Sequence, residues 1–244
     1  MVLLWPGLYN CRMMGEKKEG IQDSRAIYNK AMAGLTSVMG SLVGIAGAEH
    51  GIFEMLQGNT RPIGFFAPAI GPEQRFWEEG TERALMLIPN YLASGILTVA
   101  IGLGVIVWSI AFAGRKRSAL VLAVLSIALW LFGGGFAPVF MSIFAVAAAS
   151  RIRKPLRIWR SLAAPRFRAF LALLWPWTVV VCAVLFVFAM ANGVFGFPLI
   201  LFFDAPTTTV ILFSIGYAAI GLIVIAFVSA LSADTLGELE KEGE

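Results

Sequence analysis

The sequence predicts an all-α fold: a polytopic α-helical membrane protein with six membrane segments and with both the N and C termini on the cytoplasmic side. Three observations predict it. Hydrophobic residues make up 59% of the chain and charged residues only 14%, whereas about a quarter of a soluble domain is charged. Long apolar stretches recur, and a membrane-spanning helix needs roughly 20 such residues. Lysine and arginine are concentrated in short segments between these stretches, which is typical of cytoplasmic loops.

We divide the chain into three parts. Residues 1–30 form a cytoplasmic N-terminal segment, residues 31–232 form a helical transmembrane domain, and residues 233–244 form an acidic cytoplasmic tail that we expect to be a solvated end. We expect membrane segments at residues 31–56, 91–113, 119–133, 136–150, 169–191 and 210–231.

The third and fourth segments are expected to form a short helical hairpin. The stretch 119–150 carries no charge and is interrupted by a hairpin turn at Gly133, Gly134, Gly135 and Pro138, residues that favour a turn in a helical stretch. Each arm of about 15 residues rises only about 22 Å, which is short of the ~30 Å hydrocarbon core. The alternative is a single kinked helix, which would leave five segments.

The distribution of basic residues favours the hairpin. Residues 1–30 hold five lysines and arginines, residues 114–118 hold three and residues 151–168 hold seven, whereas the loop 57–90 holds three against four acids and the loop 192–209 holds none. Because cytoplasmic loops retain basic residues, segments 114–118 and 151–168 should lie on one side, with an even number of crossings between them. A single kinked helix would place the seven charges on the wrong side.

A stripe of small residues predicts that the first segment is tightly packed. Gly40, Gly44, Gly47 and Gly51 follow one another at intervals of four, three and four residues, which places them on one face of a helix. Close approach through small residues supplies the packing that the hydrophobic effect cannot supply in lipid. We interpret this helix-packing seam as the centre of the bundle; homodimerisation along the same face is the alternative. Candidates for the facing surface recur seven residues apart in the second segment: Gly95, Gly102 and Ser109.

The same segment ends in a candidate functional polar cluster formed by Glu49, His50 and Glu54. Ionisable residues in a membrane segment are costly and therefore indicate function. On that interpretation His50 exchanges a proton, or binds a metal together with Glu54. The alternative is that the cluster lies near the outer interface, about 27 Å along the helix, where water and the loop 57–90 satisfy it.

We expect no cofactor, no metal site and no catalytic residues. The chain has one histidine, so neither an HExxH zinc motif nor haem ligation by two histidines is possible, and any metal would need oxygen ligands from Glu49, Glu54 or the loop acids. Phosphate-binding and nucleophile motifs are absent as well. Cys11 and Cys182 are interpreted as unpaired structural thiols.

The expected partners follow from the apolar and basic composition. The main one is the lipid bilayer of a cell membrane. The segment 151–168 interleaves basic residues with Leu156, Trp159 and Leu162, a pattern suited to lying on the inner leaflet and meeting anionic lipids. Homo-oligomerisation or membership of a larger membrane complex fits the packing seam. Nucleic acid is not expected, because the net charge of +4 is spread over several loops.

Two functional hypotheses remain. The first is a non-enzymatic structural or accessory membrane component. The second is a small-solute or proton-coupled transporter or channel. In it the polar cluster lies at the outer opening of the transport path, and the glycines of the hairpin turn form a flexible or re-entrant element. An enzyme is a distant third possibility, since no acid, base and nucleophile converge.

Overall fold

The computed structural model describes residues 27–243. Nearly all of the expected N-terminal segment 1–30, with Cys11, therefore lies outside the described residues. Within them the fold is helical, as predicted, with two short strands and two 3-10 turns in the connections. The α-helices are α1 (Lys30–Leu56), α2 (Tyr91–Ala111), α3 (Ser118–Leu131), α4 (Ala137–Ala149), α5 (Arg157–Leu162), α6 (Pro165–Phe195) and α7 (Ala205–Gly243); the short elements are β1 (Phe66–Pro68), η1 (Pro72–Gln74), β2 (Arg83–Leu85) and η2 (Leu199–Leu201).

Four of the described helices, α1, α2, α6 and α7, are long and apolar enough to cross a membrane. This agrees with a membrane location. Helices α3 and α4 are apolar but have only 14 and 13 residues, so each rises about 20 Å, less than the ~30 Å of a hydrocarbon core.

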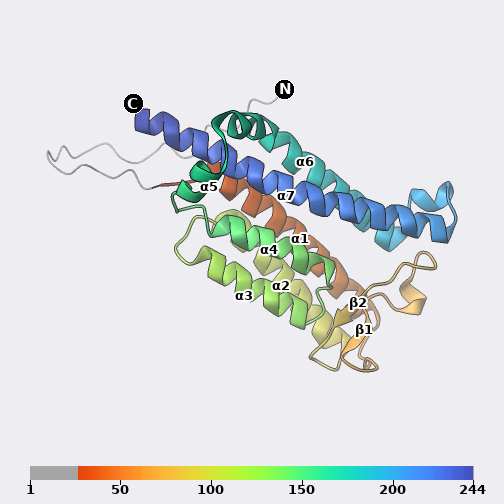
Figure 1. The fold of residues 1–244 in the computed structure, drawn as a ribbon. Coiled ribbons are helices and arrows are strands. Elements are labelled where there is room, and N and C mark those ends of the chain that lie inside the picture. The colour runs from red at the N-terminus through yellow and green to blue at the C-terminus, as the bar shows by residue number, and fades with distance from the viewer. Residues whose placement is uncertain (1–26, 244) are drawn as a thin grey trace.

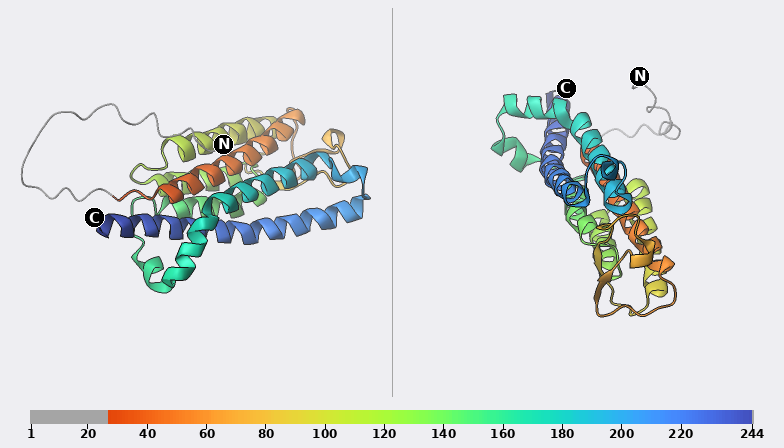
Figure 2. Two further views of the ribbon diagram at one scale, coloured as in Figure 1. Left: turned by 90° about the horizontal axis from the view of Figure 1, so that it is seen from above. Right: turned by 90° about the vertical axis from the view of Figure 1, so that its right-hand side faces the viewer.

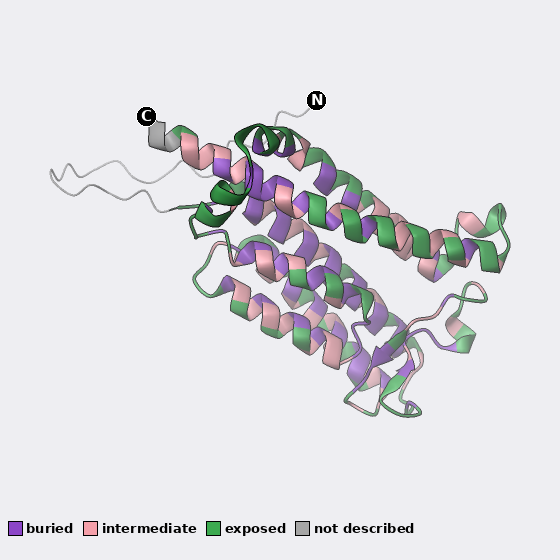
Figure 3. Cartoon of the chain, in the orientation of Figure 1, coloured by how far each residue is buried: buried purple, intermediate pink, exposed green. Residues whose placement is uncertain are grey.

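Helix α1 lies at the centre of the bundle (Figure 1). It packs against α2, α4, α6 and α7. In its most apolar stretch 61% of residues are buried, compared with 17% for α7, and the same contrast between a buried α1 and an exposed α7 is visible in Figure 3. Helices α6 and α7 pack mainly against each other.

The small-residue seam of α1 faces α2. A Cβ atom on Gly44 would lie 2.4 Å from the carbonyl oxygen of Gly102, and a Cβ atom on Gly51 would lie 2.7 Å from that of Gly95. A Cβ atom on Gly40 would lie 2.4 Å from the Cβ atom of Ser109. Side chains at these positions would force the two backbones apart, so glycine is what allows α1 and α2 to pack this closely.

The remaining glycine of the seam, Gly47, has a different neighbour. A Cβ atom on Gly47 would lie 2.6 Å from a methyl group of Leu129 on α3. The seam is therefore filled from within one chain by α2 and α3, and it leaves no open face for a second copy along the same line.

The chain reverses direction between α3 and α4, which pack side by side. The turn contains Gly133 and Gly135, both with positive φ, and α4 then begins with Pro138 in its first turn, where a missing N–H costs nothing. The structure thus has two helices over this stretch rather than one kinked helix.

The connections gather at two ends of the bundle (Figure 1). The start of α1, the α2–α3 connection, α5 and the end of α7 lie at one end, which we call the basic end because it contains segments 114–118 and 151–168. The strands β1 and β2, the α3–α4 turn and the α6–α7 connection lie at the other, which we call the loop end.

The acidic tail differs from its prediction as a solvated end. Helix α7 continues to Gly243, and the carboxylate of Asp234 accepts hydrogen bonds from the backbone N–H groups of Ala31 at 2.9 Å and Met32 at 2.8 Å. These are donors that a helix start leaves without intrahelical partners. Asn29, the residue at the capping position of α1, instead donates its side-chain amide to the carbonyl oxygens of Arg151 and Lys154. The first turn of α1 is therefore capped by α7.

The segment 151–168 also differs in part from its prediction. Leu156 is buried, and the indole N–H of Trp159 donates to the hydroxyl of Ser232 on α7 at 3.0 Å, so both residues pack on the bundle instead of facing outward. Leu162 is exposed as expected, and Ile158 is exposed beside it. Figure 2 shows that α5 and the first turns of α6 project away from the bundle.

The loop 57–90 contains an element that was not predicted, an antiparallel ribbon of β1 and β2 in which Ala67 pairs with Ala84. Beyond the ribbon, the indole N–H of Trp77 donates to the carbonyl oxygen of Gly193 near the end of α6 at 3.0 Å. The ring of Phe76 packs on that of Phe195 with centroids 4.8 Å apart. The loop therefore packs on the bundle and is not freely solvated.

Candidate functional site

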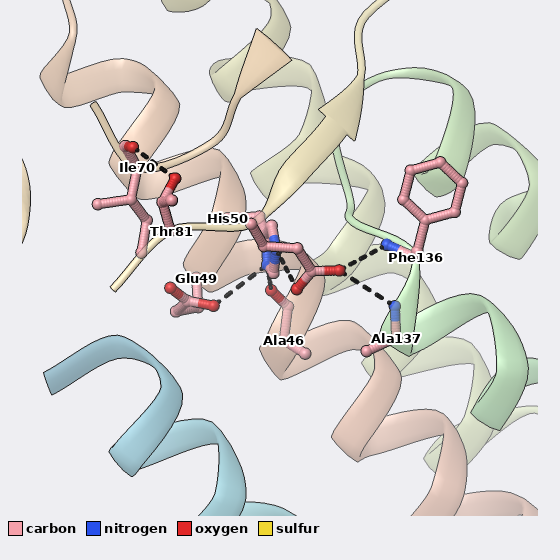
Figure 4. Close-up of polar contacts among 8 residues, drawn as sticks. Ala46, Glu49, His50, Ile70, Thr81, Phe136 and Ala137 are labelled. Carbon is pink, nitrogen blue, oxygen red and sulfur yellow. Dashed lines mark hydrogen bonds and ion pairs between the residues drawn. The ribbon is translucent and has the colours of Figure 1, made fainter. Parts of the chain in front are cut away.

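The polar cluster lies at the loop end, where three parts of the chain meet. Helix α1 supplies Glu49, His50 and Glu54, the loop before β2 supplies Glu82, and the turn between α3 and α4 supplies its glycines and backbone N–H groups. Figure 4 shows these elements converging on His50.

The imidazole of His50 has oxygen partners on both sides. Its Nδ1 lies 2.9 Å from the carbonyl oxygen of Ala46 and 3.1 Å from Oε2 of Glu49, and its Nε2 lies 3.1 Å from Oε2 of Glu82. Only 7% of the residue is exposed. Because every partner is an acceptor, a ring that donates from both nitrogens satisfies all of these contacts.

Glu82 joins His50 to the start of α4. While Oε2 contacts the imidazole, Oε1 accepts hydrogen bonds from the backbone N–H groups of Phe136 at 3.0 Å and Ala137 at 3.3 Å. A carboxylate is favoured there, because the first N–H groups of a helix lack intrahelical acceptors and carry partial positive charge.

The electrostatics of Glu82 reflect these contacts. Burial raises the pKa of its carboxyl, but the hydrogen bond and the charge of His50, with the two backbone N–H groups, outweigh burial and bring the pKa below its ordinary value of 4.5. Glu82 is therefore ionised at neutral pH.

Glu54 lies deeper and has different surroundings. It is 0% exposed, and neither of its carboxyl oxygens has a hydrogen-bond partner among the described residues. The hydroxyl of Ser94 on α2 is beside it, but the proton of that hydroxyl is donated to the carbonyl oxygen of Phe132 at 2.6 Å. Thr98, one turn further along α2, donates to the same carbonyl oxygen.

The glycine turn packs directly on the two buried groups of α1. A Cβ atom on Gly133 would lie 2.1 Å from Oε1 of Glu54, and a Cβ atom on Gly135 would lie 2.6 Å from Nε2 of His50. The φ angles are +121° at Gly133 and +74° at Gly135, conformations that residues with a Cβ atom rarely adopt. Both positions therefore require glycine, because the backbone has a positive φ angle and because there is no room for a Cβ atom.

Two features noted separately in the sequence, the polar cluster and the hairpin turn, are neighbours in space. His50 and Glu49 lie together, whereas Glu54 contacts the other side of the turn. Sequence reasoning missed Glu82, Ser94 and Thr98. Glu82 is one of four acids in its loop, and no spacing rule distinguishes it from the others. Ser94 and Thr98 could have been found, because two hydroxyl residues four apart on an apolar helix indicate a polar contact on one of its faces.

The chemistry available to this site is limited. No group of three or more His, Cys, Asp or Glu side chains that could hold a metal ion occurs in the part of the chain that the structure describes. Cys182, the free cysteine of this part, is buried on α6 away from the cluster. The contacts of His50 and Glu82 join three elements and do not present a nucleophile beside a base.

Comparisons with known proteins add no relative: no protein-family model matches the chain, and neither does any curated protein or solved structure with which it was compared.

Proposed function

We propose that this chain is a non-enzymatic accessory component of a membrane assembly and that α7 binds a further membrane helix. One observation carries the proposal. Ser214, Ala218 and Gly221 follow one another at intervals of four and three residues on α7, and all three are exposed. This is the spacing of the α1 seam on a helix whose matching face is not covered by any other part of residues 27–243.

The contrast between the two helices supports a missing partner. On α1, Cβ atoms added to Gly44 and Gly51 would collide with α2, whereas on α7 a Cβ atom added to Gly216 or Gly221 would meet nothing within 4 Å. Small residues weaken the contact of a helix with lipid, but they allow another helix to pack closely. An exposed small-residue stripe therefore favours a helix, from a second copy or from another protein, over lipid alone.

A substitution on the stripe tests this proposal. In Ala218→Leu the larger side chain should block close packing on α7, and the partner that co-purifies from mild detergent should be lost. Val124→Leu, on the exposed face of α3, is the matched control and should keep the partner. Differently tagged copies would reveal a homo-oligomer. Co-purification that is equal in both variants, or a monomer without partners in wild type, would contradict the proposal.

The proposed topology has six membrane segments and both termini in the cytoplasm. Its support is the gathering of the basic segments 114–118 and 151–168 at one end of the bundle, since cytoplasmic loops retain lysine and arginine. In this arrangement α3 and α4 cross as a short pair, with arginines beyond their ends reaching the interface. The polar cluster then lies on the outer side of a cell membrane.

We propose further that the projecting segment 151–168 contacts anionic lipids of the inner leaflet. Arg157 and Arg166 are exposed beside Ile158, Leu162 and Phe167, so charged and apolar side chains share a surface suited to the headgroup region. In R157Q/R166Q, less phosphatidylglycerol should be retained through purification, as measured by native mass spectrometry. Retention equal to wild type would contradict this contact.

A second candidate function, proton- or ion-coupled transport, is favoured by Glu54, since a buried carboxyl without hydrogen-bond partners is unusual in a purely structural site. Reconstituted vesicles test it. Solute or proton flux should be abolished in Glu54→Gln and His50→Gln if these residues couple transport, and flux that does not change would remove the support for this candidate.

A further inference from the structure

Glu54 is the buried polar group that the contacts of the candidate site leave unexplained. Its side chain is fully enclosed, and both carboxyl oxygens lack hydrogen-bond partners among the described residues. An ionised carboxylate in such a place is strongly destabilising unless a positive charge compensates it. Either a proton or a cation therefore has to neutralise it.

The cationic side chains among the described residues do not supply a positive charge to Glu54. His50, the nearest, is already paired with the carboxylates of Glu49 at 3.1 Å and Glu82 at 3.1 Å, so its one positive charge faces two negative ones. Within residues 27–243, no lysine or arginine forms a salt bridge with Glu49, Glu54 or Glu82. Counting Glu54, the ionised cluster carries more negative than positive charge.

The hydroxyl of Ser94 lies beside Glu54, and it shares the carbonyl oxygen of Phe132 as an acceptor with the hydroxyl of Thr98. Phe132 is the C-terminal capping residue of α3, so its carbonyl oxygen lies at the negative end of that helix. The hydroxyls of Ser94 and Thr98 direct their protons at this carbonyl, which leaves their lone pairs free. The carbonyl therefore already accepts two hydrogen bonds, and the oxygens left to bind a ligand are those of the carboxylate and of the two hydroxyls.

A site of this composition suits a hard cation. Such ions prefer oxygen ligands from carboxylates and backbone carbonyls, and broken membrane helices use their C-terminal ends and unwound carbonyls to coordinate sodium. The site contains one carboxylate and no further acidic, histidine or cysteine ligand. It therefore balances the charge of a monovalent cation better than that of a divalent cation. The break between α3 and α4, with Gly133 packed on Glu54, is such a helix end.

We infer that the carboxylate of Glu54 and the hydroxyl oxygens of Ser94 and Thr98, beside the C-terminal end of α3, form a binding site for a small monovalent cation of the sodium type. The site lies between α1, α2 and the end of α3, and it is separate from the contacts of His50 with Glu82. Occupation neutralises Glu54 and joins α1 and α2 to the α3–α4 turn. The inference does not depend on the proposed partner of α7, because it concerns a different part of the bundle.

Thermal unfolding of the full chain in detergent tests the inference. At constant ionic strength and pH, replacing choline chloride by sodium chloride should raise the Tm of wild type, and the rise should grow with the logarithm of sodium concentration. Glu54→Gln should fold and should lose the sodium response, whereas Glu78→Gln, an exposed acid of the same loop end, should keep it. Lithium and potassium series will show which ion size fits.

A second variant keeps the inference testable if Glu54→Gln does not fold. Thr98→Val preserves shape and removes one oxygen, so it should raise the sodium concentration at half effect by about tenfold; binding of radioactive sodium should weaken in parallel. An equal sodium response in wild type and Glu54→Gln would overturn the inference. So would a pH-dependent stabilisation that Glu54→Gln removes and that is the same at every sodium concentration, because a proton on Glu54 would then neutralise the carboxylate in place of sodium.

Discussion

At the scale of single residues, Glu82 links its own loop to α1 and to the start of α4. One of its oxygens contacts His50 on α1 and the other accepts two N–H groups at the start of α4. The sequence predicted that water and the loop 57–90 could satisfy the polar cluster, but it could not predict which residue of the loop would do so. That choice depends on the path of the loop through the ribbon of β1 and β2, which no local pattern of residues encodes.

Glu82 should make stability depend on pH in the acidic range. Its pKa is lowered by folding, so its contribution is fully present above the ordinary value of 4.5 and is lost as the pH falls through the lowered pKa. Glu82→Gln should reduce the free energy of unfolding by about 1 kcal/mol at neutral pH. Thermal unfolding at a series of pH values should show this difference shrinking below 4.5; a difference that does not change with pH would contradict the role of its charge.

Gly133 is the second residue whose identity the site dictates. In Gly133→Ala the new methyl group would meet Glu54 and would have to adopt a φ of +121°, so we expect a loss of at least about 1–3 kcal/mol. Gly216→Ala on α7 is the control, since its Cβ atom meets nothing within 4 Å. Urea or thermal unfolding compares the two. Equal stability of both variants would show that the turn does not pack on α1 in this way.

At the scale of elements, the packing of α1 on α2 follows from residues that the sequence reveals. The four-three-four spacing on α1 and the seven-residue spacing on α2 were visible beforehand, and the structure places Gly44 against Gly102 and Gly51 against Gly95. The start of α1 was not foreseeable in the same way. Its cap is Asp234, 203 residues away from Ala31, and an acidic tail in sequence looks the same whether it is solvated or capping a distant helix.

Two neighbouring glycines of α2 provide a matched test of the α1–α2 contact. Gly102→Ala should separate the helices and destabilise the bundle by about 1–3 kcal/mol, because its Cβ atom would lie 2.7 Å from the carbonyl oxygen of Gly44. Gly104→Ala should be neutral or slightly stabilising, since its Cβ atom meets only Leu125 at 4.0 Å. Thermal unfolding in detergent measures both, and the reverse order would contradict the packing.

The capping of α1 by α7 can be tested with two acids of one helix. Asp234→Ala removes the acceptor of the N–H groups of Ala31 and Met32 and should lower stability by about 1 kcal/mol. Glu240→Ala, at an exposed position further along α7, should change it by less than about 0.5 kcal/mol. A similar effect of both substitutions on the Tm would show that Asp234 acts only as one more acidic charge.

At the scale of the whole molecule, the arrangement of helices brings segments that are distant in sequence to two ends. The α3–α4 pair starts and finishes at the basic end, so the arginines of 114–118 and those of 151–168 lie on one side of the bundle. Composition and charge were sufficient to predict helices, their approximate positions and this reversal. They were insufficient for the ribbon of β1 and β2 and for the inward packing of Trp159, because those depend on contacts across the whole bundle.

The topology is tested most directly by labelling single cysteines in intact cells, in a chain whose own cysteines are replaced by serine. Lys116→Cys and Arg157→Cys should both react only after the cells are opened, because basic segments stay in the cytoplasm. Ile63→Cys, at a loop-end position that is 97% exposed, should react with a membrane-impermeant reagent from outside. Labelling of Arg157→Cys from outside, with Lys116→Cys protected, would contradict the six-segment arrangement, because residues 119–150 would then cross the membrane only once.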